Sequence, residues 1–102
     1  MNDLVDSHRA ELTALCARLH VKRLDIFGSA VRGGFDPAAS DLDFLVEFDL
    51  LEPAQYADAY FSLKEGLEAI FNRHVDLVTR SSVVNPYFRE SIESCRQQLY
   101  AA

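Results

Sequence analysis

The sequence contains few of the residues that mark disordered, disulfide-bonded or membrane-spanning proteins. Of its 102 residues only 4 are Gly, 3 are Pro and 2 are Cys, whereas 49 % are hydrophobic. This composition excludes disordered, collagen-like and low-complexity chains. No apolar run approaches the roughly 20 residues of a membrane span, and the first residues lack the apolar centre of a signal peptide. We therefore expect one cytoplasmic domain over residues 1–102, with a single ordinary core and no membrane contact.

Paired cysteines and basic clusters are lacking too. Cys16 and Cys95 have neither CxxC nor Cys/His spacing, which argues against a zinc site, and we expect both to be small buried groups. The formal net charge is −6 and the pI is about 4.9. Binding nucleic acid through its phosphates needs a basic face. The charge therefore argues against direct nucleic-acid binding and suits a basic protein partner better.

Most of the chain carries helical or strand periodicity. Apolar residues recur at helical spacing in two segments, and Pro53 suits the first turn of the second. Asn85-Pro86 is typical of a capped helix start. Alternation of apolar and polar residues indicates strands. The predicted helices are 4–19, 52–71 and 86–96, the predicted strands are 21–27, 40–48 and 74–79, and 98–101 is either an edge strand or a tail.

The strand that ends in Gly28-Ser29 has a use in anion binding. Residues 30–32 can form the first turn of a short helix before Gly33-Gly34 ends it. Free amides at such a start point toward an anion, Gly28 lets a phosphate approach the backbone, and the Ser29 hydroxyl adds a donor. Arg32 could add charge. By itself the turn is weak evidence, because it matches neither the P-loop nor the dinucleotide-binding pattern.

Two aspartates stand at the start of the next strand. Alternation in SDLDFLVEF places Asp41 and Asp43 on one face and the apolar Leu42 and Phe44 on the other. Side chains at i and i+2 of a strand start about 6.5–7 Å apart, so both carboxylates can converge on one or two hard cations. A cation would relieve their mutual repulsion. The alternative is a pair of solvated carboxylates at a strand end.

Asp76 repeats this pattern on the third strand. In HVDLVT, Val75 and Leu77 share the apolar face, whereas Asp76 lies on the other face. Aspartate is unfavourable in the middle of a strand, so Asp76 is either exposed to solvent or part of a functional site. Helices should cover the apolar side and leave Asp41, Asp43 and Asp76 accessible. His74 is expected to be only a neighbour of this group.

Four large side chains close to the end of the sequence have two interpretations. They are exposed enough to dock a partner, or they pack in the core, and we expect core packing. These residues are Tyr87, Phe88, Leu99 and Tyr100.

The segments IFGSAVRG, SDLDFLVEF and HVDLVT together resemble the minimal nucleotidyltransferase (MNT) family of the polymerase-β-type nucleotidyltransferase superfamily. NPYFRESI resembles the terminal helix of those proteins, so the resemblance covers nearly the whole chain. It implies a small α+β domain with a mixed β-sheet, helices covering one face and an open active-site face. The motif residues of the family fall on Gly28, Ser29, Asp41, Asp43 and Asp76.

The resemblance also implies roles for these residues in nucleotidyl transfer from ATP. Asp41 and Asp43 would hold two Mg²⁺ ions, and Asp76 would hold the ion nearer the acceptor and help to take its proton. The amides of Gly28 and Ser29 would bind phosphates with support from Arg32, and the Ser29 hydroxyl joins the three aspartates as the catalytic set. Eleven residues, 30–40, separate Ser29 from Asp41. This is one more than the usual family pattern, and the loop can absorb it.

MNT proteins of this size are similar to antitoxins encoded beside HEPN-domain ribonuclease toxins, and some of them attach AMP to a tyrosine of the toxin. The resemblance therefore implies an antitoxin that transfers AMP from ATP to its HEPN partner, in a hetero-oligomer, and so neutralises it. Two alternatives stay open. The chain either binds the toxin without catalysis, or it modifies a small hydroxylated substrate as a homodimer.

Overall fold

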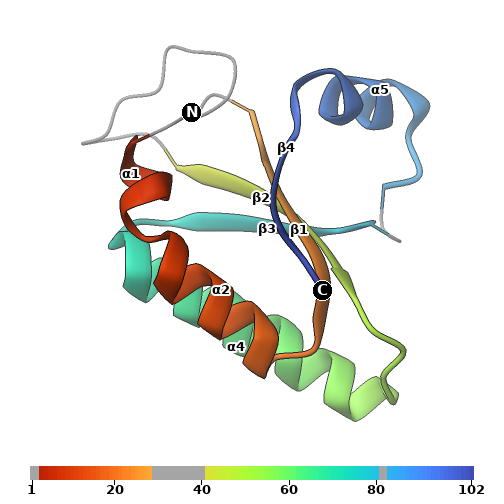
Figure 1. The fold of residues 1–102 in the computed structure, drawn as a ribbon. Helices are drawn as coiled ribbons and strands as arrows, with labels where there is room; N and C mark the ends of the chain where they lie inside the picture. Colours follow the sequence, from red (N-terminus) through yellow and green to blue (C-terminus); the bar gives the residue numbers. More distant parts are fainter. Residues whose placement is uncertain (1–2, 29–40, 81–82) are drawn as a thin grey trace.

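The chain folds into a sheet with helices packed on it. The computed structural model describes residues 3–28, 41–80 and 83–102. Figure 1 shows the first helices and the long helix lying together on one side of the sheet, with the last helix on the other. The elements are α1 (Asp3–Ser7), α2 (Arg9–Arg18), β1 (Val21–Phe27), β2 (Leu42–Phe48), α4 (Pro53–Phe71), β3 (Val75–Thr79), α5 (Pro86–Cys95) and β4 (Gln97–Ala101).

The sheet has four strands in the order β3-β2-β1-β4. β1 pairs antiparallel with both β2 and β4, whereas β2 and β3 are parallel. The parallel pair is joined through α4, because parallel strands need a long crossover connection. The predicted small α+β fold with a mixed sheet is therefore confirmed, and residues 97–101 form an edge strand.

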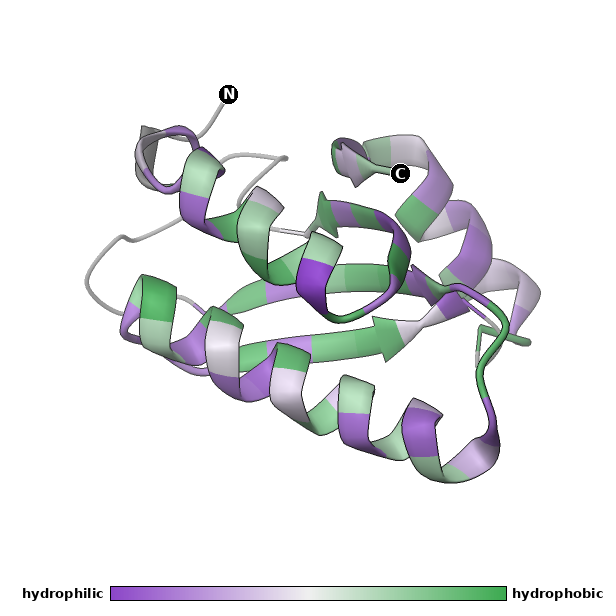
Figure 2. Ribbon diagram, turned by 60° about the horizontal axis from the view of Figure 1, so that its bottom comes forward, coloured by the Kyte–Doolittle hydropathy of each residue, from purple (hydrophilic) through white to green (hydrophobic). Residues whose placement is uncertain are grey.

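Alternation along the strands divides the apolar side chains between two faces. One face meets α2 and α4 in the main core, which includes Leu24, Phe44 and Val75. Figure 2 shows the corresponding pattern, with α4 alternating between hydrophobic and hydrophilic residues while the central strands are mostly hydrophobic. A Cβ atom at Gly66 of α4 would lie 2.7 Å from Leu15 Cδ2 of α2, so the glycine allows these helices to approach closely.

The predicted helix 4–19 is wrong in one respect, because it is two helices separated at His8. The His8 ring packs edge-on against Phe71 of α4, with ring centroids 5.5 Å apart, and its Nδ1 lies 3.0 Å from Glu11 Oε1. The turn also lets Val5 reach the core, where it is fully buried. Burial of apolar surface at the turn offsets the interrupted helical hydrogen bonding.

The second face of the sheet is accessible at one end and covered by α5 at the other. Phe27, Leu45, Val83 and Ile92 form a small separate core beneath α5. This helix begins as predicted, since the Asn85 side chain accepts hydrogen bonds from the Tyr87 and Phe88 amides. The expectation of an accessible face therefore holds where the three predicted aspartates lie, but not further along β1 and β2.

Asp25 shows the effect of this cover. Alternation along β1 puts Asp25 on the same face as Phe27 and opposite the main core, yet its side chain is 1 % exposed, between Arg23 and Arg96. Cys16 is buried as expected, and burial raises the pKa of its thiol to about 12, whereas Cys95 is only half-buried. Within the three described stretches, no helix is both long and apolar enough to cross a membrane.

Candidate metal and nucleotide site

The start of β2 packs closely against the end of β1. Phe27 and Asp43 are register partners, and Gly28 follows with a φ of +76°. A Cβ atom at Gly28 would collide with Asp43 Oδ2. Glycine is required at position 28 for two reasons. Residues with a side chain rarely adopt this left-handed conformation, and the Asp43 carboxylate occupies the space that a side chain would take.

The parallel pairing of β2 with β3 gathers the predicted carboxylates. Asp43 and Asp76 are register partners, and Asp41 comes directly before β2. His74 Nδ1 lies 3.4 Å from Asp41 Oδ2 and 3.9 Å from Asp76 Oδ1. The structure therefore brings the three predicted aspartates together, and it inserts His74 between two of them.

Burial and neighbouring charge both act on Asp43. Desolvation, the Asp76 charge, a hydrogen bond with Asp76 and the Asp41 charge, in that order, raise the pKa of Asp43 from 3.8 to about 6. Each of these favours the protonated acid over the carboxylate. Ionised Asp43 is therefore an energetically costly group in the metal-free fold.

A divalent cation fits these residues. Among the described residues, Asp41, His74 and Asp76 form a group whose ligand atoms all lie within 4.8 Å of one another. Carboxylate oxygens are the donors that Mg²⁺ prefers, and an imidazole nitrogen is an additional ligand for other divalent metals. The repulsion of Asp43 by Asp76 and Asp41 also favours a metal site here, because a nearby cation would offset it.

Asp43, His74 and Asp76 line a groove of about 460 Å³, the acidic groove, on the accessible part of the sheet face. Two of its residues come from α4: Tyr60, whose hydroxyl donates to the Leu77 carbonyl at 2.6 Å, and Lys64, whose Nζ lies 3.7 Å from Glu68 Oε2. Lys64 was not predicted from the sequence. No local signal marks it, because the helical pattern of α4 does not show which of its polar residues faces the groove. The lining residues are Phe27, Asp43, Tyr60, Lys64, His74, Asp76, Leu77, Val78 and Phe88.

The remaining predicted site residues are Ser29 and Arg32. Both lie outside the described residues, as do the short helix expected at 30–32 and the spacer 30–40. Their phosphate-binding roles stay predictions. Gly28 is the described residue that is nearest to them in the sequence.

Replacing Gly28 by Ala is expected to lower nucleotidyl transfer by about 10²-fold and to destabilise the fold by about 1–2 kcal/mol. The positive φ accounts for the loss of stability, and displacement of the Asp43 carboxylate accounts for the loss of activity. Thermal melting and initial rates at saturating ATP measure the two effects. Gly66→Ala is the control, because it also crowds a neighbour but lies away from the groove. Transfer at the wild-type rate by Gly28→Ala would contradict the prediction.

The raised pKa of Asp43 predicts a pH-dependent stability in metal-free buffer. The folded protein takes up a proton on Asp43 near pH 6 and the unfolded chain near 3.8, so the folded state binds more protons between these values. The stabilisation is complete below about 3.8 and is lost as the pH rises through about 6. Unfolding free energies measured with chelator at several pH values test this. Added Mg²⁺ should stabilise more at pH 7.5 than at pH 5, because protons compete for Asp43.

Comparison with known proteins gives a consistent result. The nucleotidyltransferase domain family matches residues 10–99. A protein of Methanocaldococcus jannaschii, provisionally named a protein adenylyltransferase, is 36 % identical over 93 residues, which cover 91 % of each chain. A solved structure provisionally described as a minimal nucleotidyltransferase has a TM-score of 0.74 and 31 % identity, and the match covers 95 % of each chain.

A more distant solved structure shares the fold alone. It contains a tri-AMPylated HEPN toxin of Shewanella oneidensis in complex with an MNT antitoxin, and the match has a TM-score of 0.64, 19 % identity and coverage of 95 % of this chain and 73 % of the other. The domain match and the close relatives span the strands that carry Asp41, Asp43 and Asp76. The chain therefore belongs to the nucleotidyltransferase domain family and is a minimal nucleotidyltransferase.

Proposed function

We propose that this chain is an antitoxin that transfers AMP from ATP to a tyrosine hydroxyl of a HEPN-domain toxin, with Mg²⁺ as the required metal. The observation that carries the proposal is the accessible acidic groove, which Asp43 and Asp76 line, with Gly28 against Asp43 and Asp41 3.4 Å from the groove residue His74. The similarity to named protein adenylyltransferases supports a protein acceptor. The shared fold with an MNT antitoxin is consistent with the HEPN partner.

The reaction is a displacement at the α-phosphorus of ATP. The tyrosine oxygen forms a bond to this phosphorus, the bond to the bridging oxygen of the β-phosphate breaks, and pyrophosphate leaves. The tyrosine proton passes to a carboxylate, for which Asp76 is the proposed acceptor. Two Mg²⁺ ions, held by Asp41 and Asp43 with Asp76 sharing one, would supply neutralisation of the negative charge on the attacking and leaving oxygens.

The other polar residues of the groove orient these groups. His74 lies against Asp41 and Asp76 and holds the two carboxylates at the starts of their strands. Lys64 brings positive charge to the groove, and we assign it to the phosphates of ATP together with the predicted donors Gly28, Ser29 and Arg32. Glu68 positions Lys64 and also accepts a hydrogen bond from the Val75 amide at 3.1 Å, so α4 and β3 are held in register at the groove.

An open groove on a single small domain suits an acceptor hydroxyl carried by another molecule. The described part of the chain offers no second domain that would hold a small substrate. Exposed apolar residues favour a protein as the carrier: Phe88, which lines the groove, and Val84 and Tyr87, which come just before it in the sequence. The alternative homodimer acting on a small substrate stays a prediction that the oligomeric state in solution will test.

The test is incubation of the protein with its cognate HEPN toxin, ATP and Mg²⁺, followed by measurement of the intact mass of the toxin. We expect an adenylyl increment that disappears with chelator or in an Asp41→Ala/Asp43→Ala variant. An Asp58→Ala variant, which removes an exposed carboxylate of α4, is the matched control and should keep the activity.

Two outcomes would contradict the proposal. The first is no increment with the wild-type protein, and the second is an equal increment with the double variant. If the double variant neutralises the toxin without modifying it, the alternative of an antitoxin that acts by binding alone is supported instead.

A further inference from the structure

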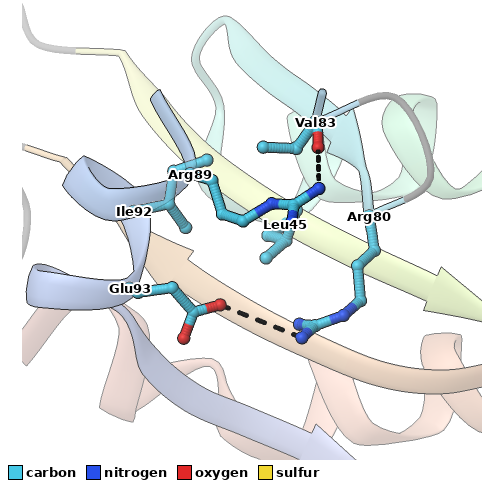
Figure 3. A pocket seen from close by; sticks show the side chains of 6 residues that line it. All are labelled: Leu45, Arg80, Val83, Arg89, Ile92 and Glu93. Atoms are coloured by element: carbon cyan, nitrogen blue, oxygen red, sulfur yellow. Dashed lines mark hydrogen bonds and ion pairs between the residues drawn. The ribbon is translucent and has the colours of Figure 1, made fainter. Parts of the chain in front are cut away.

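A second cavity lies on the same sheet face as the acidic groove. It has a volume of about 240 Å³ and is formed between β2, α5 and two residues that lie between β3 and α5 in the sequence, Arg80 and Val83 (Figure 3). Leu45 in its floor stands two residues after Asp43 on β2, so the two side chains point to the same face about 6.5–7 Å apart at the backbone. We call it the α5 pocket, lined by Leu45, Arg80, Val83, Arg89, Ile92 and Glu93.

The size of the α5 pocket fits one side chain rather than a nucleotide. Pockets that enclose small molecules and cofactors are about 300–1,000 Å³. Its floor is apolar, made of Leu45, Val83 and Ile92, each of which is buried. Arginine side chains form the walls, as Figure 3 shows. A side chain with an apolar stem and a polar end matches this combination.

The charge of the pocket is opposite to that of the protein as a whole. Arg80 Nη2 lies 3.8 Å from Glu93 Oε1, but Glu93 is also paired with Arg96 at 3.1 Å, so one carboxylate is shared by two guanidinium groups. Arg89 donates to the Val83 carbonyl at 2.9 Å, and among the described residues no carboxylate pairs with it. The pocket therefore keeps an excess of positive charge in a chain of net charge −6.

Exposed apolar residues lie just before α5 and in its first turn, where Phe88 lines the acidic groove and Arg89 lines the α5 pocket. Tyr87 is 84 % exposed and Val84 is 79 % exposed, which contradicts the expected core packing of Tyr87. The expected core packing is wrong for Phe88 too, because it is 44 % exposed. Phe88 lines the acidic groove and packs edge-on against Phe27 with centroids 6.3 Å apart. Leu99 and Tyr100, in contrast, do pack against the main core. Exposed apolar residues beside a charged pocket are the usual composition of a protein-binding surface.

We propose that the α5 pocket binds an Asp or Glu side chain of the acceptor protein, while Tyr87 and Phe88 pack on apolar residues of the same acceptor segment. The inference rests on the proposed function, because it takes the acceptor segment that enters the acidic groove to extend over the neighbouring α5. The acidic surface elsewhere repels such a carboxylate, so the pocket fixes the register in which the acceptor lies. The register in turn determines which hydroxyl reaches Asp43 and Asp76.

The test measures binding of the cognate HEPN toxin by calorimetry without ATP, and separately the KM for the toxin in the transfer reaction. Arg89→Glu should weaken binding and raise this KM by about 10-fold or more, with kcat changed less than about 2-fold. Arg89→Gln keeps a donor for the Val83 carbonyl and therefore controls for misfolding. It should weaken binding and raise the KM for the toxin less than Arg89→Glu does. Arg18→Glu on α2, an exposed arginine on the other side of the sheet, should bind as the wild type does.

Charge exchange identifies the carboxylate. Acidic residues of the toxin are changed to Lys one at a time, and one such change should restore binding to Arg89→Glu while it weakens binding to the wild type. The docking proposal is overturned if Arg89→Glu binds and adenylylates the toxin as well as Arg18→Glu does. A toxin that binds through Arg89 but is never adenylylated contradicts the proposed function instead. Absence of wild-type binding overturns both.

Discussion

Replacing Asp43 by Asn is expected to reduce adenylyl transfer by about 10³-fold and at the same time to stabilise the metal-free fold. The loss of activity follows from the missing carboxylate, because charge neutralisation by a bound metal contributes several kcal/mol to the transition state. The gain in stability follows from the pKa of Asp43, which burial and the Asp76 charge raise to about 6. At neutral pH the folded protein must ionise this group at a cost that Asn does not carry.

The size of the stabilisation can be bounded. A shift from 3.8 to about 6 is discounted because the groove is partly open to solvent, which screens the charges. About 1–2 kcal/mol then remains, which corresponds to an increase in Tm of several degrees for a domain of this size. Thermal melts with chelator near pH 7.5 measure it. The advantage of the variant should shrink as the pH falls toward 5, because wild-type Asp43 becomes protonated.

Asp58→Asn provides the control for the removal of one negative charge from a protein of net charge −6. Asp58 is exposed on α4, so this change should alter neither Tm nor activity beyond small effects. A destabilised Asp43→Asn protein would show that the carboxylate is needed for packing rather than for metal binding. Retention of activity would remove Asp43 from the catalytic set.

The sequence predicted the placement of the aspartates well, because local periodicity decides that part of the geometry. Alternation along a strand determines the face of each side chain, so Asp43 and Asp76 could be placed on one face before any strand pairing was known. The parallel register then makes them direct neighbours. The start of α4 at Pro53 and the Asn85 cap of α5 were likewise predictable, because capping chemistry involves residues close in sequence.

Features that depend on distant residues were not predictable. Lys64 reaches the groove only because α4 packs against β3, and the helical pattern of α4 does not show which polar residue faces the strand end. The break at His8 depends on its contact with Phe71. Asp25 has the same local pattern as the site aspartates, yet the return of the chain from α5 into β4 buries it. Periodicity assigns a face, but only tertiary packing decides whether that face is open.

Asp25 leads to the prediction with the largest effect on stability. Its Oδ1 accepts from Arg23 Nε at 3.2 Å, and its Oδ2 lies 3.5 Å from Arg96 Nη1. Oδ2 and Nη1 are buried, and within the described part of the chain neither makes a hydrogen bond. Asp25 and Arg96 therefore interact through their charges and not through a hydrogen bond. Changing Arg96 to Met should destabilise the protein by about 3 kcal/mol, because it leaves a buried carboxylate without its second counter-charge.

Chemical denaturation of Arg96→Met, Asp25→Asn and the double variant measures this interaction. The double variant should be more stable than Arg96→Met alone, since Asn removes the charge that the first change left uncompensated. Arg18→Met is the control for loss of a guanidinium group and should stay within about 0.5 kcal/mol of the wild type. Additive effects in the double variant would mean that Arg96 stabilises through the packing of its stem rather than through Asp25.

The position of Arg96 extends this prediction to function. It connects α5 to β4 and pairs with both Asp25 of β1 and Glu93 of α5, so it fixes α5 on the sheet face. Arg96→Met should therefore loosen α5 and with it Phe88 and the α5 pocket, while Asp43 and Asp76 stay in place on their strands. We expect toxin binding to weaken and amide exchange in α5 to rise, with Mg²⁺ binding unchanged. Equal loss of Mg²⁺ and toxin binding would show that the fold, rather than α5, depends on this ion pair.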